Sequence, residues 1–279
     1  MRPHRPGIRW TSSSLIQLLL ITNTVLVLYP ILMMGLSAFK STPELFRNPF
    51  GLPENWNLAN FIKVWERTNF PLYFRNSLIV TSGAVLLILV LGVMAAYALA
   101  RYRFRGNELL YLFFLSGLMI PLRLAVIPLF IQLKAMGLIN NHLGLICIYG
   151  AQGLPSAVFI LTGFLRTLPS DLEDAARIDS ASELQILLRI MLPLTRPALV
   201  IVAIYNLVPV WNDFFFPLVF LQKESLKTLP LGLTVFMGQY STDWAVLFAG
   251  LSLAALPVVV VYIFMSRQFI AGLTAGALK

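Results

Sequence analysis

Charged residues are scarce in this sequence. Of its 279 residues only 12% are Asp, Glu, Lys or Arg, whereas 58% are hydrophobic and the mean hydropathy is +0.80. Soluble domains carry roughly 25% charged residues, because their surfaces must face water. The composition therefore excludes an ordinary soluble domain and favours a polytopic membrane protein.

Cysteine and histidine are also rare. The single cysteine, Cys147, excludes an intrachain disulfide and a cysteine-based metal cluster. The two histidines, His4 and His142, are far apart in the sequence, and no carboxylate pattern accompanies them. Neither indicates a metal ligand or a catalytic base, so we predict no metal site in this chain.

Several motifs that are typical of enzymes are missing. The sequence has no G-x-x-x-x-G-K-[ST] loop for nucleotide phosphates, no G-x-S-x-G elbow and no H-E-x-x-H helix. We therefore expect a chain that is not an enzyme by itself and binds no cofactor. Energy for an active process would have to come from a partner.

Long hydrophobic runs dominate the sequence instead. Each has roughly 22 to 25 residues, which is enough for a tilted helix to cross a hydrocarbon core of ~30 Å. They predict an all-α membrane protein with six transmembrane helices, at residues 15–36, 77–100, 109–133, 143–165, 198–221 and 244–265. The chain then divides into an N-terminal tail (1–14), the first span (15–36), an outer loop (37–75), a core (76–266) and a C-terminal tail (267–279).

The arginines predict the orientation. Arginine-rich segments between spans stay on the cytoplasmic side, and they occur in the N-terminal tail, at residues 101–105 and at residues 166–196. With six spans, both termini are expected in the cytoplasm. The basic loop 37–75 would lie outside, because long loops translocate with little regard to charge. Topology thus accounts for the net charge of +9 without a nucleic acid partner.

One stretch, residues 168–192, is too acidic for a bilayer. Two S-x-x-E/Q patterns, Ser170 to Glu173 and Ser182 to Gln185, predict capping boxes that open two short helices with a corner between them. The stretch holds five of the twelve acidic residues: Asp171, Glu173, Asp174, Asp179 and Glu183.

Both predicted helices are amphipathic. On the first, helical spacing places Leu172, Ala175 and Ala176 on one face. Pro193 ends the second helix. The apolar stripe on the second consists of Leu184, Leu187, Leu188 and Met191. An ordinary pair of amphipathic surface helices would show the same pattern.

The sequence EDAARIDSA, followed by Leu-Pro at 192–193, resembles the EAA loop in the membrane subunits of ATP-binding-cassette importers. Asp174, Ala175 and Ala176 stand where that family has Glu-Ala-Ala, and Asp179 where it has Asp. Ser180 replaces the usual glycine. If the corner needs a positive φ, serine would cost about 1–2 kcal/mol there.

This resemblance implies a coupling helix that docks on a cytoplasmic ATPase and transmits its closure to the membrane helices. The implied ATPase-coupling residues are Asp174, Ala175, Ala176, Asp179, Ser180 and Leu184. ATP and Mg would be bound by the ATPase, not by this chain.

Polar residues within the hydrophobic runs are candidates for a solute pathway. The run WNDFFFPL, residues 211–218, resembles the carbohydrate-importer branch of the family, and aromatic rings beside hydrogen-bonding groups suit a sugar. Hydrogen bonds between helices are the alternative. Prolines 121, 128, 209 and 217 are expected to kink or break the third and fifth spans. The pathway candidates are Arg123, Asn206, Trp211, Asn212 and Asp213; whether Arg123 pairs with Asp213 stays open.

The C-terminal third also resembles the carbohydrate branch, in TLPLGL, GQYSTDW and GLTAGALK. The resemblance implies that the last outer loop faces a solute-binding protein, with Gln239, Tyr240 and Asp243 as contacts. It also implies that the C-terminal tail, made pliable by Gly272 and Gly276, lies against the ATPase.

Together these similarities imply the permease subunit of a carbohydrate importer in a bacterial or archaeal plasma membrane, working by alternating access. The implied partners are a second, similar permease, two ATPase subunits, an extracytoplasmic binding protein and membrane lipid. The alternatives are an importer for amino acids, phosphate or metal chelates, an ion-coupled secondary carrier and an intramembrane hydrolase. The last lacks a histidine base in any span.

Overall fold

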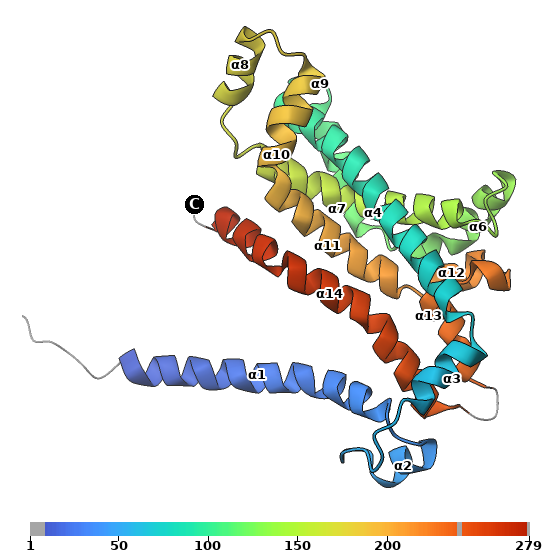
Figure 1. Cartoon of the computed structure of the whole chain (residues 1–279). Coiled ribbons are helices and arrows are strands. Elements are labelled where there is room, and N and C mark those ends of the chain that lie inside the picture. Colours follow the sequence, from blue (N-terminus) through green and yellow to red (C-terminus); the bar gives the residue numbers. More distant parts are fainter. Residues whose placement is uncertain (1–8, 239–241, 278–279) are drawn as a thin grey trace, which may run out of the picture. The chain divides into compact units, whose positions relative to one another are not determined.

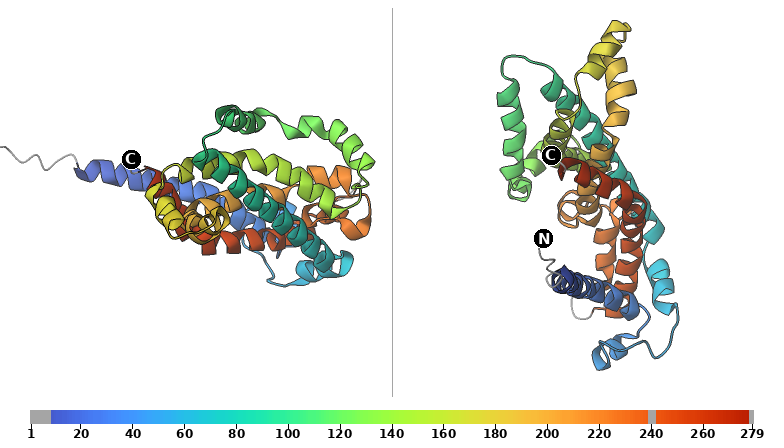
Figure 2. Two further views of the ribbon diagram at one scale, coloured as in Figure 1. Left: turned by 90° about the horizontal axis from the view of Figure 1, so that it is seen from above. Right: turned by 90° about the vertical axis from the view of Figure 1, so that its left-hand side faces the viewer.

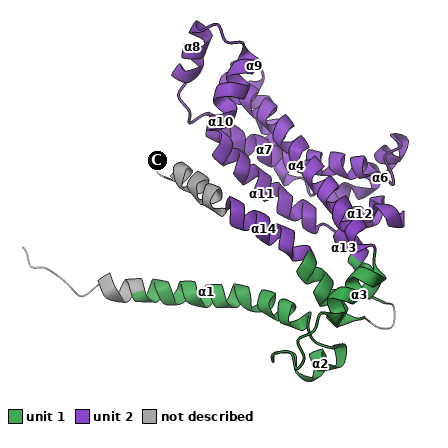
Figure 3. Cartoon of the chain, in the orientation of Figure 1, with its two compact units in different colours: residues 1–68, 233–253 green, residues 69–232, 254–279 purple. Residues whose placement is uncertain are grey.

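The structure is a computed structural model that describes residues 9–238 and 242–277, with side chains for 14–238 and 242–265. Helices dominate these residues, and the only β contact within them is an isolated bridge between Met237 and Thr242. The chain forms two compact units (Figures 1 and 3). Unit 1 comprises residues 1–68 and 233–253, and unit 2 comprises residues 69–232 and 254–279.

Unit 1 begins with α1 (Arg9–Ser37), the first predicted span, whose described side chains are exposed over most of its length. The outer loop contains two short helices, α2 (Thr42–Arg47) and α3 (Ala59–Arg67). Between α1 and α2, Lys40 is fully buried and its Nζ donates to the carbonyl of Asn48 at 2.8 Å. The 3-10 turn η5 (Leu233–Phe236) and the first part of α14 (Trp244–Ala277) complete the unit.

Unit 2 is built around α4 (Phe70–Arg101) and α7 (His142–Leu165), which pack side by side (Figure 2). Gly92 permits their close approach, because a Cβ there would lie 2.7 Å from the Cβ of Ala157. The helices between them are α5 (Asn107–Ser116), η1 (Gly117–Met119), η2 (Leu122–Ala125) and α6 (Val126–Ala135).

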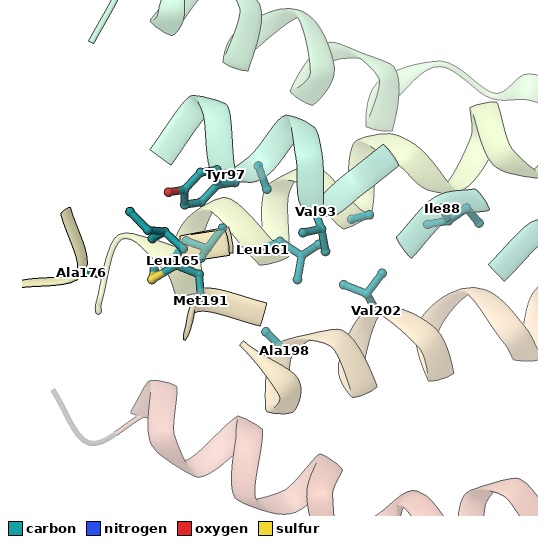
Figure 4. Close-up of a cluster of buried hydrophobic side chains, with 12 residues drawn as sticks. Ile88, Val93, Tyr97, Leu161, Leu165, Ala176, Met191, Ala198 and Val202 are labelled. Carbon is teal, nitrogen blue, oxygen red and sulfur yellow. The ribbon is translucent and has the colours of Figure 1, made fainter. Parts of the chain in front are cut away.

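After α7 the chain of unit 2 forms a series of shorter elements. These are α8 (Asp171–Ile178), α9 (Glu183–Ile186), the π-helical η3 (Leu187–Met191), α10 (Leu192–Leu194), α11 (Arg196–Asn212), α12 (Phe215–Phe220), η4 (Glu224–Leu226) and α13 (Leu229–Gly232). One apolar cluster joins α4, α7, α8 and α11; it includes Val93, Leu161, Ala176 and Val202 (Figure 4).

Within the described residues, α1, α4, α7 and α14 are each long and apolar enough to cross a membrane. Two bent helix pairs pass the same test together: α5 with α6, at 85°, and the helix from Glu183 to Leu194 with α11, at 75°. Each pair is either a broken span or a re-entrant loop. The six predicted spans are therefore compatible with the fold, although α4 begins at Phe70, earlier than predicted.

Proline explains two of the breaks. Its ring clashes with the carbonyl four residues earlier. For Pro121 this carbonyl belongs to Gly117, and α5 ends one residue earlier, at Ser116. The fifth run, predicted as one helix over 198–221, is broken at Asp213, four positions ahead of Pro217. Pro128 lies in the first turn of α6 and Pro209 inside α11, so neither breaks its helix, and a kink at either proline stays a prediction.

The C-terminal tail differs from the prediction. α14 continues as a helix through Ala277, so no boundary separates the sixth span from the described part of the tail. Gly272 and Gly276 are isolated within a run of helix-forming residues, and each lowers helix stability by only about 1 kcal/mol. The described part of the tail is therefore helical, and its pliability stays a prediction.

Candidate coupling loop and membrane cavity

The coupling loop, residues 168–192, is attached to the spans through an ion pair. Arg101, the last residue of α4, places its Nε 2.9 Å from Oε1 of Glu173 in α8, and only 9% and 4% of the two side chains are exposed. Arg101 also donates from Nη2 to the carbonyl of Leu168 at 3.1 Å. Burial raises the pKa of Glu173, and the nearby Arg101 and Arg177 oppose this shift.

Because of this ion pair, the start of α8 differs from the prediction. Ser170 is the N-cap residue of α8 but its side chain makes no capping hydrogen bond. Glu173, which should have closed the capping box, is directed to Arg101 instead. The second predicted box is confirmed, because Ser182 and Gln185 make both reciprocal bonds at the start of α9.

Arg177 joins the two short helices. Its guanidinium contacts Asp174 in its own helix and Glu183 in α9, at 2.9 Å each. Glu183 also accepts a hydrogen bond from the Tyr102 hydroxyl at 2.7 Å. The hydrogen bond from Arg177, assisted by that from Tyr102, lowers the pKa of Glu183. Both helices are thus tied to each other and to the end of α4.

The corner between the helices has the positive φ that was anticipated. Ser180 has φ 60°. The N–H of Ala181 bonds to the carbonyl of Ala176, and the N–H of Ser180 to that of Arg177, both at 3.0 Å. These two bonds form a Schellman motif, in which the residue at the Ser180 position is usually glycine. Serine therefore occupies a strained position.

The apolar faces of both helices differ from the prediction. Of the predicted face on α8 only Ala176 is buried, whereas Leu172 and Ala175 are exposed. On the second helix Met191 is buried as predicted and Leu187 is half-buried, but Leu184 and Leu188 are exposed and Ile186 is buried instead. On α8 the cause is Glu173, which faces inward toward Arg101. On the second helix the π-helical turn η3 shifts the positions of the following side chains around the helix axis.

The coupling loop consequently presents exposed apolar side chains. Ile178 is 83% exposed and Leu184 is 63% exposed, with Leu172 and Leu188 exposed beside them in the sequence. Asp179, the C-cap of α8, and Asp174 are also exposed. Exposed apolar groups of this kind, next to charged ones, are typical of an interaction site.

A second candidate site is a cavity of about 500 Å³ within unit 2. The elements around it are η1, η2, α7, α11 and the start of α12. Three predicted pathway residues, Arg123, Asn206 and Asp213, line it. Sequence reasoning missed its other polar residues, which are Tyr149, Gln152, Ser156 and Tyr205. Three of these recur at intervals of three and four residues in α7, a polar stripe that could have been recognised in the fourth run.

Asp213 organises the polar end of this cavity. Its Oδ1 lies 3.4 Å from Nη2 of Arg123, and its Oδ2 accepts a 2.8 Å hydrogen bond from the Tyr149 hydroxyl. The backbone N–H groups of Phe215 and Phe216 also bond to its carboxylate, at 3.4 and 3.0 Å. The Asp213 side chain is 8% exposed and that of Arg123 is 69% exposed. Asp213 is thus a fixed acceptor, whereas the Arg123 side chain is mostly exposed, with its guanidinium 5.7 Å from the ring centroid of Phe215.

Asn206 lines another part of the same cavity. Its side-chain amide donates to the carbonyl of Val202 at 2.9 Å and to the hydroxyl of Ser156 at 3.5 Å. A Cβ on Gly153 would lie 2.5 Å from Oδ1 of Asn206, so α7 must carry glycine for α11 to approach. Asn206 therefore serves helix packing as well as the cavity lining.

Two predicted pathway residues lie elsewhere. Trp211 is buried, with its Nε1 donating to the carbonyl of Ala254 at 3.0 Å and its ring edge-on to Phe74 at 5.7 Å. Asn212 is exposed and does not line the cavity. Helical spacing places both side chains on other faces of α11 than Asn206, which lines the cavity.

Of the three residues predicted to contact a binding protein, the structure describes Asp243, which lies in unit 1. Asp243 accepts a hydrogen bond from Thr42 at 3.1 Å and lies 3.6 Å from Arg67. Gln239 and Tyr240 lie outside the described residues. In the part of the chain that the structure describes, no group of three or more His, Cys, Asp or Glu side chains is placed to hold a metal ion.

Known proteins resemble this chain over nearly its whole length. A diacetylchitobiose uptake system permease protein of Streptomyces coelicolor is 38% identical over 94% of this chain and 87% of its own length. An arabinooligosaccharides transport system permease protein of Halalkalibacterium halodurans is 36% identical over 91% and 92%. Among solved structures, a bacterial ABC transporter involved in alginate import has the same fold, with a TM-score of 0.82 and 22% identity, covering 96% of this chain and 100% of that one.

Residues 88–271 match the model of a family described as "Binding-protein-dependent transport system inner membrane component". These residues include the coupling loop, the membrane cavity and most of the spans of unit 2. The family membership predicted from the EAA-like sequence is confirmed. This chain belongs to the family of inner membrane components of binding-protein-dependent transport systems.

Proposed function

We propose that this chain is the permease subunit of an ATP-driven importer for a carbohydrate. One observation carries the proposal: two short helices with exposed apolar side chains are joined to a membrane span by a buried ion pair, Arg101 with Glu173. An exposed element that is firmly attached to a span can transmit an external force to it.

The coupling mechanism follows from these contacts. An ATPase bound to Ile178 and Leu184 would displace α8 and α9 as one body, because Arg177 bonds to both helices. Arg101 and Tyr102 would pass this displacement to the end of α4. Since α4 packs along α7, the movement reaches the helices that line the cavity, which is the rearrangement that alternating access needs.

The cavity supports a sugar as the solute. It offers hydroxyl, amide and carboxylate groups together with the rings of Tyr149 and Tyr205, which suit the hydroxyls and C–H faces of a sugar. Asp213 balances the charge of Arg123, so an uncharged solute fits better than phosphate or an amino acid. Relatives named for diacetylchitobiose, arabinooligosaccharides and melibiose/raffinose/stachyose agree with this assignment.

The chain would catalyse no reaction itself and would act with partner proteins. We propose that it assembles with a second permease, with two ATPase subunits that hold ATP and Mg, and with an extracytoplasmic binding protein. The sequence supports cytoplasmic termini through its basic segments. The Asp243 region of unit 1, together with Gln239 and Tyr240, would contact the binding protein, and the C-terminal residues would contact the ATPase.

Copurification tests the proposal. The tagged chain, gently solubilised from its native membrane, should retain an ATPase and a second permease, and the complex should hydrolyse ATP. Leu184→Asp, or Asp174→Lys with Asp179→Lys, should release the ATPase, whereas Phe50→Asp should not, because Phe50 is equally exposed but lies in the outer loop. A chain that is folded but never associates with an ATPase would overturn the assignment.

Solute identity needs a separate measurement. The intact complex, in vesicles with its binding protein, should take up radiolabelled neutral oligosaccharides but not amino acids or phosphate. Uptake of a charged solute in preference to every sugar would overturn the carbohydrate assignment and leave the permease assignment in place.

A further inference from the structure

Unit 2 contains a second cavity, of about 490 Å³, that the proposed transport mechanism does not use. It lies where α4 ends and α5 begins, beside the last turn of α7. Tyr102, Arg103, Gly106 and Arg166 are among the residues that line it. α4 is long and apolar enough to cross a membrane and ends here, next to the coupling loop. With α4 in the bilayer, its end brings the cavity to the level of the lipid headgroups on the side of the coupling loop.

The backbone at this position favours an anion. Gly106 is the N-cap residue of α5, has φ 89° and has no side chain with which to cap the helix. The side chain of Asn107 is already used, because its amide donates to the carbonyls of Tyr102 at 2.8 Å and Leu99 at 3.3 Å. The N–H of Asn107 bonds to the carbonyl of Phe104 at 3.2 Å. The N–H groups of Glu108 and Leu109 in the first turn are left for an external acceptor, with the positive end of the helix dipole behind them.

Two arginines reinforce the positive potential. Arg103 and Arg166 are both exposed and both line the cavity. The guanidinium of Arg166 lies 4.9 Å from the ring centroid of Tyr111, which holds it against α5. Glu108, also in the lining, carries the opposing charge. The arginines and the helix N-terminus together leave the cavity positive.

Apolar side chains adjoin this charged cavity. Leu109 is 73% exposed and lines it, and Phe104, also in the lining, is exposed. Phe113, one turn along α5 from Leu109, continues the exposed apolar surface. A free phosphate ion would gain nothing from these groups, whereas a phospholipid could lay its acyl chains against them.

We propose that this cavity binds the headgroup phosphate of an anionic phospholipid such as phosphatidylglycerol. Arg103, Arg166 and the first-turn N–H groups of α5 hold the phosphate, and Phe104, Leu109 and Phe113 contact the acyl chains. Tyr102 links the cavity to the coupling loop, because its hydroxyl bonds to Glu183. Bound lipid thus stabilises the connection through which the coupling loop acts.

Native mass spectrometry of the full chain with its copurifying subunits tests the proposal, using phosphatidylglycerol and phosphatidylcholine as probes. At ~1 kcal/mol per arginine near an anionic headgroup, the two arginines give phosphatidylglycerol about a thirtyfold advantage. Arg103→Gln with Arg166→Gln should abolish that advantage. Arg75→Gln with Lys134→Gln, which removes two exposed cations that do not line the cavity, should preserve it.

A gain-of-affinity variant distinguishes binding from folding effects. Glu108→Gln removes the opposing charge and should tighten phosphatidylglycerol binding by about fivefold. If the double arginine variant does not fold, Arg166→Gln alone should weaken binding by about the same factor. Equal binding of the two lipids in the complex, displacement by inorganic phosphate at matched concentration, or an equal loss in the control variant would each overturn the proposal.

These outcomes do not depend on the transported solute. A complex that fails to hydrolyse ATP but retains phosphatidylglycerol would contradict the transport assignment alone.

Discussion

The Nε of Arg101 lies 2.9 Å from Oε1 of Glu173, and both side chains are almost fully buried. Arg101 closes a membrane span and Glu173 belongs to the first helix of the coupling loop. Removing one partner of a buried pair leaves an uncompensated charge, which costs far more than loss of an exposed pair. The attachment of the coupling loop therefore depends on this contact.

Breaking the pair should be strongly destabilising. Arg101→Gln is expected to lower the free energy of unfolding by about 3–5 kcal/mol. Arg47→Gln, which removes the exposed pair with Glu54, should cost about 0–1 kcal/mol. Thermal unfolding of the two purified variants makes the comparison. Equal shifts in melting temperature would show that the Arg101 contact is not a buried pair in the protein.

The strained corner predicts a stabilising substitution. Ser180→Gly should raise the free energy of unfolding by about 1 kcal/mol, because glycine adopts a positive φ without the Cβ clash. Ser182→Ala, two residues away, should lower it by about 1 kcal/mol through loss of the α9 cap. Thermal unfolding should show opposite shifts. A lower melting temperature for Ser180→Gly would contradict the left-handed corner.

The pH dependence of stability should report on Glu173. Burial raises its pKa above that of an unfolded glutamate, so between the two values the folded state binds more protons. The unfolding free energy should therefore fall as pH rises through this window and level off above the folded pKa. Glu173→Gln should remove that fall. Melting temperatures between about pH 4 and pH 7 test this, and parallel profiles would rule it out.

The cavity pair should be energetically coupled. Arg123→Gln, Asp213→Asn and the double variant, compared for ATP hydrolysis stimulated by the binding protein, form a double-mutant cycle. We expect the double variant to be more active than Asp213→Asn alone, because no unpaired guanidinium remains facing the cavity. Lys134→Gln with Asp213→Asn is the matched control and should give no such recovery. A double variant no better than the worse single variant would mean that the pair is not coupled.

The sequence identified the elements of this fold because each depends on local composition. Long apolar runs must become helices in a bilayer, since no water satisfies their backbone groups. The capping box at Ser182 is likewise local and appears where it was predicted. The positive φ at Ser180 was considered only as a condition, and the structure meets it. Asn206 and Asp213 were recognised as cavity candidates because polar groups within apolar runs are costly.

The direction of individual side chains was decided by tertiary contacts. Glu173 faces inward only because Arg101 at the end of α4 meets it there, although 72 positions separate the two in the numbering of the chain (173 − 101). Trp211 packs against Phe74 and donates to the carbonyl of Ala254 instead of lining the cavity.

Composition and local pattern alone indicated that this chain spans a membrane and carries an acidic stretch of two short helices with a corner between them. Only the tertiary structure decided which face of α8 remains free, which polar residues share a cavity and where α4, α5 and α7 form a basic pocket. The physical reason is that backbone hydrogen bonding and hydropathy act within one segment, whereas burial and charge pairing depend on segments that the chain brings together.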